Sequence, residues 1–143
     1  MAVNQLFRKE IAVKDAFLNF GLLWLRLLTG AGIVYHGYEK LFHSDMSQMI
    51  TGVGKMGFPH PEIFAWAAAL SEFLGGILIA TGLFTRTAAL FVCCTMTVAA
   101  FVALAKDPLQ VKELALAYWT ISGALIFMGG GALSFDSVFF KKK

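Results

Sequence analysis

The fold of this chain is decided by two stretches that contain no charged residue. They are Thr87–Ala105, with the sequence TAALFVCCTMTVAAFVALA, and Leu114–Phe135, with the sequence LALAYWTISGALIFMGGGALSF. About 20 consecutive apolar residues are enough for an α-helix to cross the hydrocarbon core of a bilayer. Both stretches therefore predict membrane-spanning helices.

The composition of the whole chain agrees with a membrane location. Of its 143 residues, 58% are hydrophobic and only 15% are charged, whereas a soluble domain has about 25% charged residues. This balance excludes a disordered chain, a nucleic-acid-binding domain and an ordinary cytosolic enzyme. The length fits one domain, and with loops it has room for about four spans.

Two further apolar stretches are each interrupted by a single charge. Phe17–Tyr35 contains Arg26, and Ile63–Leu83 contains Glu72. A charge at the centre of a spanning helix costs about 2.5–3.5 kcal/mol, and each Leu, Ile, Phe or Val offsets about 0.3–0.6 kcal/mol of that cost. The first stretch has ten such residues and the second has nine, so both are able to insert. The sequence therefore predicts an all-α, integral membrane four-helix bundle.

The expected domain covers residues 16–136, and its four spans place both ends of the chain on one side. The predicted helices cover about residues 17–35, 63–83, 87–105 and 114–133. The side with the termini carries seven Lys and Arg residues outside the helices, and the other side carries four. Because positively charged loops stay in the cytoplasm, we expect both termini there. Residues 1–15 then form a cytoplasmic segment able to lie on the membrane surface as a helix, and residues 137–143 form a cytoplasmic tail.

Arg26 and Glu72 are the strongest candidates for chemistry. Ionisable side chains within a membrane normally face the protein interior and pair with one another. Each lies near the middle of its span, so antiparallel packing is expected to bring both close to the bilayer midplane. One interpretation is a polar site in the bundle core that binds an anionic or polar head group, or that relays protons. The other is an Arg–Glu pair that only sets the helix register.

Other residues are candidates for the wall of such a site. Gly76 leaves space one turn beyond Glu72, although small residues at four-residue spacing also let helices pack closely. Lys40 lies at the outer end of the first span, where it can either extend to the interface or turn toward a ligand. Glu113, Tyr118 and Trp119 belong to the last span. The two aromatic rings there are suited to a flat ligand, and equally to filling the bundle.

The sequence contains no pattern typical of a resident metal or nucleotide cofactor. The spacing of its His, Cys, Asp and Glu residues matches no familiar zinc pattern, so we expect no metal. Cys93 and Cys94 are adjacent, and adjacent helical residues point in directions that do not allow an ordinary disulfide bond.

A series of short motifs gives the chain a resemblance to a known family. The motifs are Arg26, Gly37-Tyr38-Glu39-Lys40, Gly57-Phe58-Pro59, Glu72-Phe73-Leu74-Gly75-Gly76, Gly82-Leu83-Phe84-Thr85-Arg86, Glu113-Leu114-Ala115-Leu116 and Gly131-Ala132-Leu133-Ser134-Phe135-Asp136. Because the motifs occur in this order and spacing, the chain resembles the DoxX family of small four-helix membrane proteins. The resemblance extends from about Leu22 to Asp136. That family is grouped with the DoxD subunit of thiosulfate:quinone oxidoreductase. The resemblance implies a multi-pass protein of the bacterial cytoplasmic (inner) membrane, with a link to quinone-dependent oxidation that involves a partner subunit.

These observations lead to one functional hypothesis and two alternatives. The hypothesis is a membrane component of a quinone-linked redox system that binds a small polar-headed ligand in the bundle core. The alternatives are a non-enzymatic scaffold or assembly partner, and a carrier of small molecules or lipids. Whether the chain is an enzyme stays open, and at most it would be the membrane subunit of a quinone-dependent oxidoreductase.

The hypothesis assigns roles to particular residues and partners. Glu72 and Arg26 are the candidate catalytic residues. The candidate ligand-binding residues are Arg26, Lys40, Glu72, Gly76, Glu113, Tyr118 and Trp119. The expected cofactor is a quinone, and the expected partners are membrane lipid, a redox subunit and further copies of the chain, with no nucleic acid.

Overall fold

A computed structural model describes residues 2–139, with side chains described from residue 13 onward. Over this range every regular element is helical, as the sequence predicts. The elements are α1 (Ala2–Tyr38), the π-helix η1 (Glu39–His43), α2 (Met46–Lys55), α3 (Pro61–Thr81), α4 (Thr85–Val98), the π-helix η2 (Ala99–Ala103), α5 (Leu109–Met128) and α6 (Phe135–Phe139).

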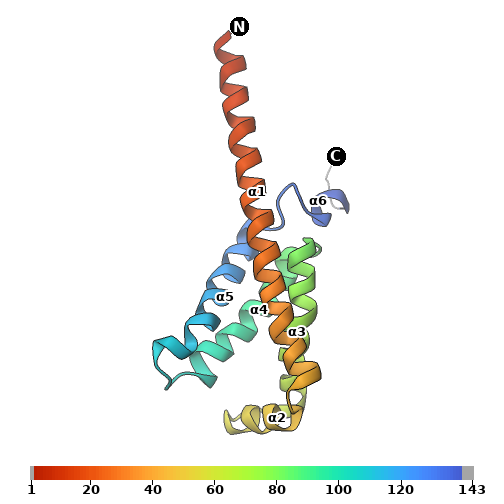
Figure 1. Cartoon of the computed structure of the whole chain (residues 1–143), viewed down its shortest axis with the longest axis vertical. Coiled ribbons are helices and arrows are strands. Elements are labelled where there is room, and N and C mark those ends of the chain that lie inside the picture. Colours follow the sequence, from red (N-terminus) through yellow and green to blue (C-terminus); the bar gives the residue numbers. More distant parts are fainter. Residues whose placement is uncertain (1, 140–143) are drawn as a thin grey trace.

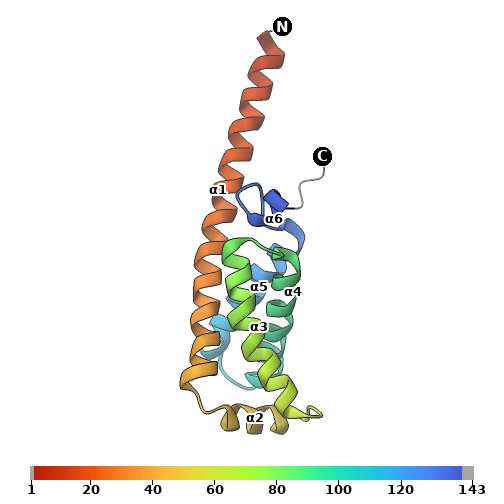
Figure 2. The same cartoon turned by 90° about the vertical axis from the view of Figure 1, so that its right-hand side faces the viewer.

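Four helical stretches within the described residues are long and apolar enough to cross a membrane. They are Val13–His43, Pro61–Thr81, Thr85–Ala103 and Leu109–Met128. In Figures 1 and 2 these stretches form a bundle, α2 lies across one end of it, and the start of α1 and the short helix α6 lie toward the other end. The predicted four-span, all-helical fold is therefore confirmed.

Two helix boundaries differ from those expected. The separate segment expected over residues 1–15 is instead the first part of α1, which projects beyond the bundle (Figure 1). No Gly or Pro interrupts the chain before Gly21, so nothing in the sequence breaks the helix there. The last span begins at Leu109 and ends at Met128, several residues earlier than expected. Pro108 precedes it, and Gly129 ends it with φ of 73°.

The outside of the bundle is apolar and the inside is built of small side chains. Phe17 and Phe127 are 75% and 82% exposed, as expected of side chains that contact lipid. The buried core contains Ile33, Ile79, Ala88, Ala89, Val92, Met96 and Leu125. Since lipid tails are as apolar as these side chains, close packing of the helices contributes most of the stabilisation.

The closest approach between helices is that of α1 and α3. A Cβ atom added to Gly30 would lie 2.6 Å from the carbonyl oxygen of Gly76 and 2.7 Å from the Cβ of Ala80. One added to Gly37 would overlap the backbone of Phe73. The two backbones are therefore in contact at several levels, and only one antiparallel register allows this.

This contact gives a first prediction. Gly37→Leu should lower the free energy of unfolding by about 1–3 kcal/mol, because the new side chain has to displace the backbone of α3. Gly21→Leu is the matched control, since nothing lies within 4 Å of a Cβ at Gly21. Thermal unfolding in detergent measures both. Equal melting temperatures for the two variants would contradict the close contact.

Candidate functional site

The membrane part of the chain contains a buried ion pair between Lys40 and Glu72. The Lys40 Nζ atom lies 2.5 Å from Oε1 and 2.6 Å from Oε2 of Glu72. The Glu72 side chain is fully buried, whereas that of Lys40 is 34% exposed. The ammonium therefore reaches inward from the end of the bundle and neutralises a carboxylate that has no contact with solvent.

Lys40 is held in an unusual backbone conformation. It belongs to the π-helix η1, in which the amide of Ser44 donates to the carbonyl oxygen of Glu39 at 2.7 Å. A second π-helix, η2, has the equivalent bond from Leu104 to Ala99 at 3.0 Å. π-Helical turns are rare and are frequently found at functional sites.

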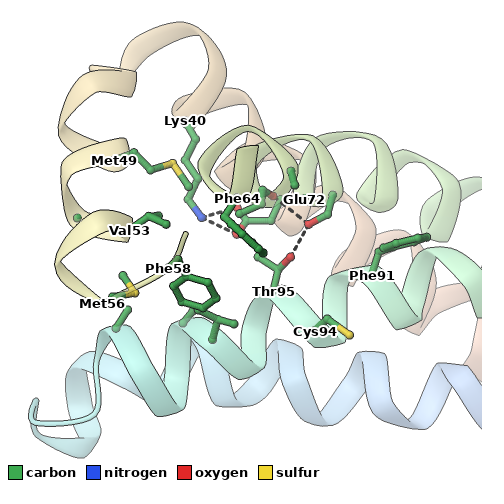
Figure 3. Close-up of a pocket in the computed structure, with 17 residues that line it drawn as sticks. Lys40, Met49, Val53, Met56, Phe58, Phe64, Glu72, Phe91, Cys94 and Thr95 are labelled. Atoms are coloured by element: carbon green, nitrogen blue, oxygen red, sulfur yellow. Dashed lines mark hydrogen bonds and ion pairs between the residues drawn. The ribbon is translucent and has the colours of Figure 1, made fainter. Parts of the chain in front are cut away.

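Both π-helices contribute to one cavity of about 490 Å³. The cavity lies between α2, α3 and α4, and Figure 3 shows the ion pair at its edge. Lys40 and Glu72 are its only charged residues. The full lining is Lys40, Met49, Gly52, Val53, Met56, Phe58, Phe64, Ala67, Ala68, Ser71, Glu72, Phe91, Cys94, Thr95, Val98, Ala99 and Ala103.

The other polar side chains of the lining include two hydroxyl groups that are bonded to each other. The Ser71 and Thr95 hydroxyl oxygens are 2.6 Å apart, and the Ser71 hydroxyl also lies 2.9 Å from the carbonyl oxygen of Ala68. These bonds join α3 to α4 beside the cavity. An ammonium has three N–H donors, and Lys40 directs two of them to Glu72. The third is the strongest donor left for a ligand.

Helix α2 covers the end of the cavity. Asp45 caps the start of α2 by accepting a hydrogen bond of 2.9 Å from the amide of Ser47. Met49 and Val53 of this helix and its C-cap residue Met56 line the cavity (Figure 3). Their spacing of four and three residues places them on one face. Flexible methionine side chains suit a wall that adapts to different ligands.

Arg26 does not meet Glu72, so the Arg–Glu pair, one of the two interpretations of the sequence, is wrong. Arg26 is fully buried beside Gly82, and its Nη2 donates to the carbonyl oxygen of Leu133. Gly82 is ten residues beyond Glu72, which corresponds to about 15 Å along a helix. The glycine contacts of α1 with α3 set this register, and the positions of the charges within each apolar stretch did not reveal it.

The C-terminal segment folds over the end of the bundle that contains Arg26. The carboxylate of Asp136 accepts hydrogen bonds from the amides of Phe84 at 2.6 Å and Thr85 at 2.9 Å, and so caps the start of α4. The amide of Asp136 donates to the carbonyl oxygen of Gly82 at 2.8 Å. Arg26 and Asp136 together hold the segment after α5 against the α3–α4 turn, which is a structural role.

Two of the other candidate residues lie away from the cavity. Gly76 is buried against α1, where a Cβ would lie 2.8 Å from the amide nitrogen of Val34. Glu113 is exposed near the start of α5. Neither residue lines the cavity.

The two aromatic candidates pack between helices. Tyr118 faces α1, with its ring centroid 5.9 Å from that of His36 and its hydroxyl against Gly32. The indole N–H of Trp119 donates to the Thr97 hydroxyl at 3.0 Å, across α4 and α5. Neither ring lines the cavity. Of the predicted set, only Lys40 and Glu72 line the cavity.

Several lining residues were missed from the sequence. Met49 and Met56 lie between the first two expected spans, where the amphipathic spacing of α2 was the available signal. Phe58 and Phe64 flank the turn before α3, with ring centroids 4.9 Å apart. Cys94 lines the opposite wall. Among the described residues, no group of three or more His, Cys, Asp and Glu side chains is placed to hold a metal ion.

The fold and the cavity define a small multi-pass α-helical membrane protein. The family model DoxX matches residues 21–105, which include Arg26, Lys40 and Glu72. This chain belongs to the DoxX family. It is similar to an uncharacterized protein of Haemophilus influenzae, with 34% identity over 135 residues that cover 90% of this chain and 97% of that protein. No solved structure matches the chain.

The ion pair predicts an asymmetry between its two partners. Lys40→Met leaves a fully buried carboxylate without a partner, which should cost up to about 3–5 kcal/mol of unfolding free energy. Glu72→Gln should cost less, because the partly exposed Lys40 can turn outward. The double variant Lys40→Met/Glu72→Gln should be more stable than Lys40→Met alone. Unfolding in detergent measures all three.

Arg26 supplies the control for this comparison of single and double variants. Because Arg26 and Glu72 do not touch, the effects of Arg26→Ala and Glu72→Gln should add. A coupling between these two as large as that between Lys40 and Glu72 would contradict the observed pairing.

Proposed function

We propose that this chain is the membrane component of a quinone-linked redox system and that a quinone head group binds in the cavity between α2, α3 and α4. The observation that carries the proposal is an apolar cavity of about 490 Å³ with one ion pair at its edge. Ligand sites have volumes of about 300–1,000 Å³ and a few polar groups among apolar walls.

The residues of the cavity fit the parts of a quinone. Phe58 and Phe64 offer faces for a flat ring, and the remaining N–H of Lys40 can donate to a ring oxygen. The Glu72 carboxylate is placed to hold a proton and exchange it with such an oxygen. A bound quinone supplies the two-electron chemistry, and a partner subunit supplies or removes the electrons. Lys40 and Glu72 orient the head group and manage its protons.

We also propose that the chain lies in the bacterial cytoplasmic membrane with both termini in the cytoplasm. The bias of Lys and Arg residues supports this orientation. The similarity to a protein of Haemophilus influenzae supports the bacterial setting. In this orientation α2 and the cavity lie toward the outer side of the membrane.

Quinone retention tests the function. Protein purified gently from its native membrane should contain about one quinone per chain, measured by extraction and absorbance. Lys40→Met and Glu72→Gln should each retain at least tenfold less quinone per chain than the wild type, because both groups contact the head. Lys112→Met and Glu113→Gln remove the same charges outside the cavity and should retain it. A protein without quinone, or equal retention in all variants, would reject the proposal.

Cysteine labelling tests the orientation. In a Cys93→Ser/Cys94→Ser background, Lys106→Cys places a thiol in the α4–α5 loop and Lys143→Cys places one at the C-terminus. A membrane-impermeant maleimide should label the first in intact cells, and the second only after permeabilisation. The reverse pattern would show that the chain has the opposite orientation.

A further inference from the structure

The cavity contains a fully buried charged group, but the charges of its lining residues sum to zero. Lys40 and Glu72 are opposite in sign and in direct contact, and no other lining residue carries a formal charge at neutral pH. The nearby pair of Glu39 and His43, 3.9 Å apart, is not part of the lining. A ligand head therefore meets a polar group whose charge is already compensated.

A charged head group would have to disrupt this compensation. An anion that binds the Lys40 ammonium competes with Glu72. If the anion displaces Glu72, a buried carboxylate is left without a partner. A cation that binds Glu72 displaces Lys40 in the same way. Burying an unpaired charge is far more costly than burying a hydrogen-bonded neutral group. An uncharged head that accepts a hydrogen bond can use the third N–H of Lys40 and leave the pair intact.

The walls show where such a ligand comes from. Phe64 of α3 and Phe91 of α4 line the cavity, yet they are 43% and 60% exposed. Both helices are long and apolar enough to span the membrane, so their exposed sides contact lipid tails. The cavity is thus continuous with the lipid phase on this side, while α2 covers its end (Figure 3). A molecule with an apolar tail can enter head first and leave the tail among the lipids.

We infer that the Lys40–Glu72 pair acts as a charge filter that restricts the cavity to amphiphiles with an uncharged, hydrogen-bond-accepting head. This inference rests on the proposed function in one respect only, that a ligand occupies this cavity. It extends that function because it names the property of the head group that is selected. Lipids with an anionic head are excluded by the pair.

The test uses three probes that share one chain and differ in head charge, namely oleyl alcohol, oleyl sulfate and oleylamine. Binding to the purified full-length protein in detergent is measured by native mass spectrometry. Wild type should bind the alcohol at least tenfold more tightly than either charged probe. Glu72→Gln leaves Lys40 uncompensated and should raise the affinity for the sulfate at least tenfold relative to the alcohol.

Two controls separate charge from shape and folding. The double variant Lys40→Met/Glu72→Gln has an uncharged cavity again and should return to the preference for the alcohol. Glu113→Gln removes a carboxylate outside the cavity and should behave as wild type. Melting temperatures confirm that each variant is folded, and a variant that does not fold is replaced by Glu72→Met.

The outcomes also separate this inference from the proposed function. Binding of oleyl alcohol without any quinone would support the filter and overturn the quinone role. Quinone binding together with equal affinity for the three probes would overturn the filter and leave the quinone role standing. An unchanged preference in Glu72→Gln, or no binding of any probe to the wild type, would also overturn the filter.

Discussion

The close antiparallel packing of α1 on α3 determines where the charges of the membrane part lie. Gly30 and Gly37 bring the backbone of α1 into contact with that of α3 around Gly76 and Phe73. This contact allows a single register. It sets the end of α1 beside Glu72, so that Lys40 in the following π-helix reaches the carboxylate. The same register carries Arg26 to the level of the α3–α4 turn, at the opposite end of the bundle.

The two ends of the bundle consequently have different roles. At one end Arg26 and Asp136 fasten the C-terminal segment to the α3–α4 turn and cap α4. The motifs Gly82–Arg86 and Gly131–Asp136 meet there, although 44 residues lie between them in the chain. At the other end Gly37–Lys40 and Glu72–Gly76 meet beside the cavity. Four of the motifs on which the DoxX resemblance rests therefore form one structural group and one group at the candidate site.

The candidate site differs from ordinary bundle packing in three ways. Two π-helices border the same cavity, a buried carboxylate lies at its edge, and an amphipathic helix covers its end. Tight packing would need none of these features, and the buried ion pair costs stability relative to an apolar core. The proposed site for an uncharged amphiphile accounts for the covering helix and the ion pair, because it needs an adaptable apolar wall and one compensated polar group.

The sequence by itself determined the four spans, the all-helical class and the buried positions of Arg26 and Glu72, because hydropathy and the cost of inserting a charge are local properties. It also singled out Lys40, but not its partner. Only the tertiary structure decided that Lys40 pairs with Glu72, that Arg26 holds the C-terminal segment, and that Glu113, Tyr118 and Trp119 lie outside the cavity. Those outcomes depend on helix register and on which face of each helix meets which neighbour. Contacts between glycines far apart in the chain set the register of α1 on α3, and no local pattern encodes it.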